Sequence, residues 1–185
     1  MACLSNYTLK GIAGSCEANL AGIKKAWLGY ANDFAFDLED ATDQNIEKHT
    51  VGVSGTSSAA TLHEYVFNKQ TGSLTSTLTK DETNGTNYYT NTVTLQFTRM
   101  EQSKHLEIEA MAKEHLCGII LDNNGEYWLV GWDGYLSLDE DTTQTGQSYD
   151  DLNGYQLTLN AMSGYKPINV NKDYLDDMIS AGTNV

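Results

Sequence analysis

A stretch in the middle of the chain, residues 73–99, limits the possible folds more than any other part of the sequence. In its second half, apolar residues that include Val93 and Leu95 occupy every second position, and threonine or glutamine stands between them. Such alternation is typical of a β-strand with one buried face. The pair Asn84-Gly85 precedes this half and favours a tight hairpin turn. We therefore predict a long hairpin, whose return arm reaches about 40 Å at about 3.3 Å per residue.

The two faces of this predicted hairpin differ in chemistry. One face is apolar and is interrupted only by Asn91. The other face, which we call the hydroxyl face, is almost purely threonine and serine. It consists of Ser73, Thr75, Thr77, Thr79, Thr90, Thr92, Thr94, Gln96 and Thr98.

The remaining segments predict more strands and one helix. Residues 101–115 carry apolar side chains at helical spacing and are predicted to form the only long helix. We expect a flexible loop at 37–60, an acidic loop at 139–151 and a C-terminal arm at 165–185, in which 168–170 is extended. Further strands are predicted at 24–30, 61–67, 116–121, 126–132, 136–138 and 153–161. The pattern predicts a single α+β domain, dominated by β-structure, over residues 1–185.

Length and composition agree with one globular domain. The chain has 185 residues, of which 40% are hydrophobic, and one proline. Its formal net charge of −14 would repel DNA from the molecule as a whole, although a local basic patch is compatible with it. Three cysteines without close pairing do not predict a disulfide framework. No apolar run approaches the length of a membrane span, so we expect no membrane partner.

Catalytic and metal-binding motifs do not assemble in this sequence. It lacks the G-x-S-x-G, P-loop and G-x-G-x-x-G patterns. Glu126 is the best single candidate for a catalytic acid. A glycosidase, however, needs two carboxylates in different environments, and no second one accompanies Glu126. The acidic stretch 139–141, or Asp122 with Asn124, could hold calcium, but neither has the ligand pattern of an EF-hand loop. We expect no enzyme, no cofactor and no metal site.

The segment 119–134, IILDNNGEYWLVGWDG, allows two interpretations. Its apolar halves flank a turn, which predicts a hairpin. On a regular strand Trp128 and Trp132 would share a face with Val130, and an exposed pair of this kind could stack on sugars. The alternative, which we favour, is that both tryptophans belong to the core.

The order of these elements resembles the tail tube proteins of long-tailed bacteriophages. More narrowly, it resembles the tail-tube-like proteins of Bacteroidetes phages and prophages. The resemblance covers most of the chain and holds no catalytic signature. It is carried by GIKKAWLGY, by SLTSTLTKDETNGTNYYTNTVTLQFTRMEQSKHLEIEAMAKEHLCGIILDNNGEYWLVGWDG, and by DLNGYQLTLNAMSGYKP.

The resemblance implies an antiparallel β-sandwich or barrel with one packed helix. It further implies a structural virion protein, assembled in the host bacterial cytoplasm, whose rings, usually hexameric, stack into a tube. The expected partners are other copies of the chain and other phage tail proteins, and DNA passes through the channel without specific binding. Within this architecture we expect the hydroxyl face to line the channel, because short neutral hydroxyls hold water without attracting phosphate. The segments 37–60, 81–87 and 165–185 are the expected contacts between copies.

Two other functions remain open from the sequence. A carbohydrate-binding or adhesion module would expose aromatic side chains among Tyr88, Tyr89, Tyr127, Trp128 and Trp132. A tail terminator or completion protein would form one ring and then stop.

Overall fold

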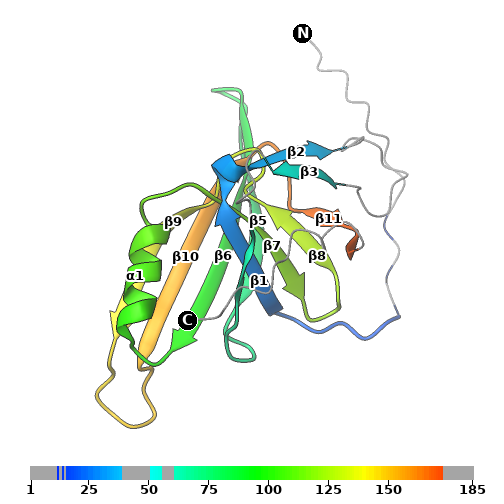
Figure 1. Cartoon of the computed structure of the whole chain (residues 1–185). Coiled ribbons are helices and arrows are strands. Elements are labelled where there is room, and N and C mark those ends of the chain that lie inside the picture. Colours follow the sequence, from blue (N-terminus) through cyan, green and yellow to red (C-terminus); the bar gives the residue numbers. More distant parts are fainter. Residues whose placement is uncertain (1–11, 13, 15, 39–50, 56–60, 173–185) are drawn as a thin grey trace.

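The computed structural model describes residues 12, 14, 16–38, 51–55 and 61–172 of the chain (Figure 1). These residues form a mainly β fold with two packed antiparallel sheets, a separate two-stranded sheet and one α-helix. The predicted α+β fold and the β-sandwich with one packed helix are confirmed. No helix in the described ranges is long and apolar enough to cross a bilayer.

The larger sheet has five strands, and its central strand is buried on both faces. Every residue from Leu116 to Leu121 is buried, which explains why this part of the sequence is an unbroken apolar run. All neighbouring strands of the sheet are antiparallel. In order across the sheet, the strands are β11 (Ile168–Val170), β8 (Tyr127–Val130), β7 (Leu116–Asp122), β1 (Ile23–Tyr30) and β4 (His63–Tyr65).

The second sheet has four strands and contains the predicted long hairpin. The hairpin is formed by β5 (Ser73–Asp81) and β6 (Thr86–Thr98), and its turn includes Gly85 at a φ of 67°. β10 (Gly154–Ser163) pairs with the other side of β6, and β9 (Ser137–Gln144) pairs with β10. Both β5 and β9 are therefore edge strands of this sheet.

Two apolar clusters hold the sandwich together. The first fills the space between the sheets, where Val93 and Leu95 of β6 and Leu157 of β10 meet Leu28 and other residues of the five-stranded sheet. The second lies on the other face of the five-stranded sheet and includes Trp27. Full burial of a large apolar side chain stabilises the fold by about 1.5–3 kcal/mol.

The helix α1 (Gln102–Met111) contributes to the first cluster through Ile108 and Met111. It is shorter than the predicted helix over 101–115. After Met111 the chain tightens into a turn, in which the backbone N–H of Lys113 donates to the carbonyl of Ala110 at 3.2 Å. His115, at the end of the predicted helix, lies outside α1 on the surface, where its ring stacks on Tyr135 with centroids 4.9 Å apart.

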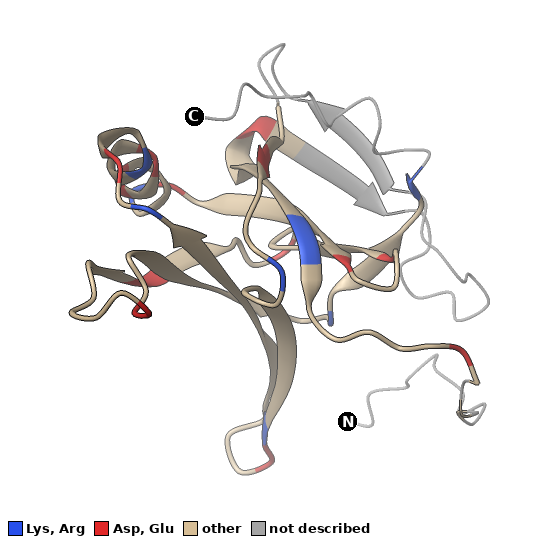
Figure 2. Ribbon diagram, turned by 90° about the horizontal axis from the view of Figure 1, so that it is seen from below, with Lys and Arg blue, Asp and Glu red and all other residues tan. Residues whose placement is uncertain are grey.

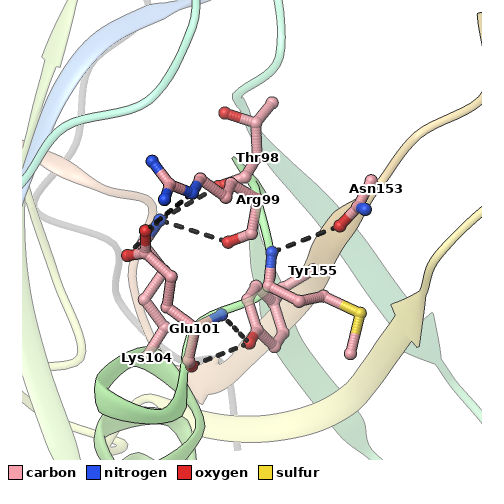
Figure 3. Close-up of polar contacts among 7 residues, drawn as sticks. Thr98, Arg99, Glu101, Lys104, Asn153 and Tyr155 are labelled. Atoms are coloured by element: carbon pink, nitrogen blue, oxygen red, sulfur yellow. Dashed lines mark hydrogen bonds and ion pairs between the residues drawn. The ribbon is translucent and has the colours of Figure 1, made fainter.

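A compact polar cluster fixes the connection between β6 and α1 (Figure 3). The Tyr155 hydroxyl accepts a hydrogen bond from the backbone N–H of Glu101 and donates one to its carbonyl, both at 3.1 Å. The Glu101 carboxylate forms ion pairs with Arg99 at 3.0 Å and Lys104 at 3.2 Å. These contacts orient the helix relative to the end of the four-stranded sheet.

Two predicted loops contain strands. β2 (Phe34–Leu38) and β3 (Val51–Gly55) pair with each other, so the predicted flexible loop 37–60 is wrong at those positions. Residues 39–50 and 56–60 lie outside the described residues. β9 occupies much of the predicted acidic loop 139–151. In the predicted arm 165–185, β11 is part of the five-stranded sheet as an extended segment, and residues 173–185 lie outside the described residues.

The turn between β7 and β8 organises the chain around it. The Asp122 carboxylate accepts hydrogen bonds from the backbone N–H groups of Asn124 at 2.8 Å and Glu126 at 2.9 Å, and from the Trp128 indole at 3.1 Å. Asn123 and Asn124 in turn bond to residues 19–22, which lead into β1. The predicted hairpin is therefore confirmed, and its polar residues hold the entry to β1.

Candidate functional site

The nine residues of the hydroxyl face lie on one side of the four-stranded sheet, opposite the core. Val93 and Leu95, which alternate with these residues along β6, are fully buried, so the two sets lie on opposite faces of the strand as predicted. The strand register brings the two arms together, with Ser73 beside Thr94 and Thr75 beside Thr92. Thr77 lies beside Thr90 in the same way. The prediction that these residues share a face is confirmed.

This polar surface continues across β10 and β9, which sequence reasoning did not join to it. Thr94 has Thr158 as its partner in β10, and Thr158 has Glu140 as its partner in β9. The alternation of polar residues in the segment 153–161 predicts a strand with one polar face. Only the strand register shows that this strand lies beside β6. We call the combined surface the outer sheet face. It adds Gln156, Thr158, Asn160, Ser137, Glu140 and Thr142 to the hydroxyl face, together with one large apolar side chain, Met162, which is 67% exposed.

Hydrogen bonds link side chains across the outer sheet face. The Thr92 hydroxyl donates to Asn160 Oδ1 at 2.6 Å, and Asn160 Nδ2 donates to Asp139 Oδ2 at 2.8 Å. The Ser137 hydroxyl donates to Asp139 Oδ1 at 3.0 Å. These polar groups therefore satisfy one another, which reduces their tendency to bind a passing solute.

The outer sheet face carries acidic side chains and no basic ones. Strands β6, β9 and β10 contain no lysine or arginine. The single lysine of β5, Lys80, has the opposite parity and forms an ion pair with Glu82 at 2.8 Å. Figure 2 shows the long hairpin as an uncharged ribbon up to its tip. A polyanion would find no basic side chain on this face.

Both edges of the four-stranded sheet are open to solvent in the described chain. Most residues of β5 and β9 are exposed. β9 carries Asp139, Glu140 and Asp141, and the register shift beside Leu159 marks a bulge. Charges and bulges at an edge limit uncontrolled strand pairing, so this edge is protected in the free chain.

The tryptophans of the segment 119–134 do not form a shared binding face. β8 ends at Val130, and Gly131 has a φ of 75°, which turns the chain. Trp128 packs against the cluster between the sheets, whereas Trp132 packs against the cluster on the opposite face. The expected same-face pair is therefore wrong, while the packing of both residues against the core is confirmed. All five aromatic residues considered for sugar binding are partly buried.

The candidate acid and metal residues are engaged in structural contacts. Glu126 Oε2 accepts a hydrogen bond from Asn169 at 2.7 Å, and Asp122 holds its turn. Among the residues that the structure describes, no group of three or more His, Cys, Asp or Glu side chains gathers as a metal site. Burial raises the pKa of the Cys117 thiol to about 12, which keeps it protonated and unreactive at neutral pH.

No protein-family model matches the chain, and no curated protein matches it significantly.

Proposed function

We propose that this protein is a structural subunit of a bacteriophage tail tube. Copies join through the edges of the four-stranded sheet into rings, which we expect to be hexameric, and the rings stack into a tube that conducts DNA. The protein is then a virion component that is assembled in the host cytoplasm and contacts other tail proteins. The observation that carries the proposal is the outer sheet face, a broad hydroxyl and amide surface without lysine or arginine, on a sheet with two open edges.

Strand direction supports closure of the sheet into a ring. Neighbouring strands in the order β5-β6-β10-β9 are antiparallel, so β5 and β9 run in opposite directions. When a copy is rotated into the next position of a ring, its β5 can pair with β9 of its neighbour and continue the antiparallel pattern. Such head-to-tail contacts close into rings, and closure removes the exposed edges.

The chemistry of the outer sheet face supports its placement toward the channel. DNA binds proteins mainly through phosphate contacts with lysine and arginine. A wall of threonine, serine, glutamine and asparagine offers hydration without those contacts. Glu140 on the same face adds repulsion, which acts within about 8–10 Å in physiological salt.

Negative-stain electron microscopy of the purified protein tests the proposal. Wild-type protein at high concentration is expected to form hollow tubes. Single rings that do not stack would replace the tube assignment with a tail terminator. Monomeric protein under all conditions would contradict assembly by this chain alone.

A variant of the edge strand tests the mode of assembly. Ser76→Glu with Leu78→Glu places two negative charges on the exposed part of β5, and Leu78 is already 48% exposed. We expect the variant to fold and to form no rings, because these charges would face the acidic residues of β9 across the junction. Gln102→Glu with Gln147→Glu is the control, since both positions are exposed and lie outside β5 and β9. Normal rings in the β5 variant would exclude this edge as the junction.

A further inference from the structure

A groove opens between the helix and one edge of the five-stranded sheet. One wall is β4 with the end of β1, and the other wall is α1. It encloses about 530 Å³. Apolar side chains dominate its lining, among them Leu28, Tyr65, Val66, Phe97, Ile108 and Met111.

The two walls of the groove are tied together. The Tyr65 hydroxyl donates to Glu107 Oε1 at 2.6 Å, which links β4 to α1. Tyr65 also packs edge-on against Phe97, with centroids 6.2 Å apart. At the rim Val66 is 58% exposed although it follows directly on a strand of the sheet. The groove is therefore a preformed apolar surface with an uncovered rim.

The C-terminal segment of the chain, residues 173–185, has a sequence suited to such a groove. Tyr174, Leu175, Met178 and Ile179 follow the spacing i, i+1, i+4 and i+5, which gathers apolar side chains on one side of a helical turn. The acidic residues of the segment fall on the opposite side. An amphipathic segment of this kind is a common occupant of apolar grooves.

The strand register separates the start of the apolar stripe, Tyr174, from the groove of its own chain. Val170 lies on the same line across the sheet as Lys25, three strand spacings away. Gly29, which lines the groove, is four residues farther along β1, so Val170 and Gly29 are about 20 Å apart at about 4.8 Å per strand and about 3.3 Å per residue. β11 runs away from the groove, and Tyr174 is four residues beyond Val170, a reach of at most about 14 Å. The complete stripe, which begins at Tyr174, therefore does not fit the groove of its own chain, and a second copy can supply it whole.

We propose that the groove between β4 and α1 binds the apolar stripe of the C-terminal segment from a second copy of this chain. The inference rests on the proposed self-assembly and names one of its contacts. It joins copies through side-chain packing at a place separate from the edges of the four-stranded sheet. Each copy offers one groove and one segment, so the contact can propagate from copy to copy.

A peptide-binding experiment tests this contact directly. A fluorescent peptide with the sequence of residues 172–185 is titrated into full-length protein whose own stripe carries Leu175→Asp and Met178→Asp. We expect saturable binding by fluorescence anisotropy. Val66→Asp in the same protein should weaken binding by about ten-fold or more, because it places a charge against the bound apolar stripe.

Leu106→Asp is the matched control. Leu106 is 59% exposed against 58% for Val66, and it lies on α1 outside the groove lining. It should leave binding within about two-fold of the starting protein. Absence of saturable binding, or equal losses from the two substitutions, would overturn the proposal.

A complementation experiment with full-length protein provides a second measure. The Val66→Asp protein has an intact stripe, and the protein with Leu175→Asp and Met178→Asp has an intact groove. An equimolar mixture is expected to form a complex with one copy of each in sedimentation velocity, beyond the association of either protein alone. No gain on mixing would overturn the contact.

The outcomes separate this inference from the proposed function. Tubes in the micrographs without peptide binding would exclude this contact and leave tube assembly standing. Peptide binding by a protein that forms neither tubes nor rings would retain the contact and contradict the tube.

Discussion

At the scale of single residues, Asp122 shows how one carboxylate can decide the meaning of a motif. In the sequence it suggested calcium beside an aromatic run. In the structure its two oxygens accept three hydrogen bonds that close the β7–β8 turn and hold the Trp128 indole. A carboxylate with these donors is an internal anchor, and the aromatic ring it holds belongs to the core.

We predict that Asp122→Ala lowers the free energy of unfolding by about 2–3 kcal/mol, since it removes bonds to a charged acceptor and leaves the donors without a partner. The midpoint of urea denaturation measures this loss. Asp150→Ala, in an exposed loop, is the control and should change stability by less than about 0.5 kcal/mol. Equal losses in the two variants would show that the Asp122 bonds contribute nothing specific.

Other single residues could not have been placed from the sequence. Asn91 interrupts the apolar face of the hairpin, and it is 2% exposed in the structure. Its amide donates to the carbonyl of Tyr165, 74 residues away, at 3.2 Å. The prediction that Trp132 shares a face with Trp128 is wrong for a related reason, because the positive φ of Gly131 turns the chain before Trp132. Both outcomes depend on contacts or dihedrals that periodicity does not contain.

At the scale of elements, the strands with one buried face were predictable and the edge strand β9 was not. The β5–β6 hairpin followed from alternation and from its turn residues, and both arms lie within about two residues of the expected bounds. In β9 only Leu138 packs against the core cluster, while Asp139, Glu140 and Asp141 face solvent. The composition of this exposed edge strand is that of a loop, which explains why the sequence predicted a loop there.

Two turns of the second sheet should respond to acid. Hydrogen bonds from the Thr83 backbone, and from Asn84, lower the pKa of Asp81 below 3.8. Those from the Ser148 and Gln147 backbones lower the pKa of Asp151 in the same way. Because the folded pKa values are depressed, the stabilisation is present above the ordinary pKa and is lost as pH falls through the folded value.

We expect the amide proton shifts of Thr83 and Ser148 to titrate in NMR spectra with midpoints below 3.8. Asp81→Asn should abolish the transition at Thr83 and leave the one at Ser148, which makes each turn the control for the other. Midpoints at or above the ordinary value would mean that these bonds do not favour the ionised carboxylate.

At the scale of the whole molecule, the class of fold was predictable and its connectivity was not. Alternating strands with one helix predicted a β-dominated domain, and the structure confirms a sandwich. The pairing of β6 with β10, and of β1 with both β7 and β4, joins segments far apart in the chain. Without that pairing, the hydroxyl face could be predicted as a property of one hairpin but not as part of a four-stranded surface.

The outer sheet face yields a prediction for the assembled particle. Thr92→Lys with Thr94→Lys should leave assembly intact but make the tubes retain DNA, with retention that falls as salt rises. The readout is co-sedimentation of labelled DNA with tubes, and circular dichroism checks the fold, because the Thr92 bond to Asn160 is lost. The control is Gln102→Lys with Gln147→Lys, which makes the same change in net charge. Equal DNA retention in the two variants would exclude this face as the channel wall.

The position of β1 has a consequence for how the chain is made. β1 is among the first described residues to be synthesised, yet it lies inside a sheet whose neighbouring strand β7 comes much later. Its entry is held by a bond between Leu20 and Asn124, 104 residues apart. At about 5–20 residues per second, Trp27 and Leu28 leave the ribosome about 5–20 s before their partners in β7. The β5–β6 hairpin needs only local contacts and closes in about 1–10 μs. We therefore expect this hairpin to form first, and β1 to be incorporated into the five-stranded sheet only after β7 has been synthesised.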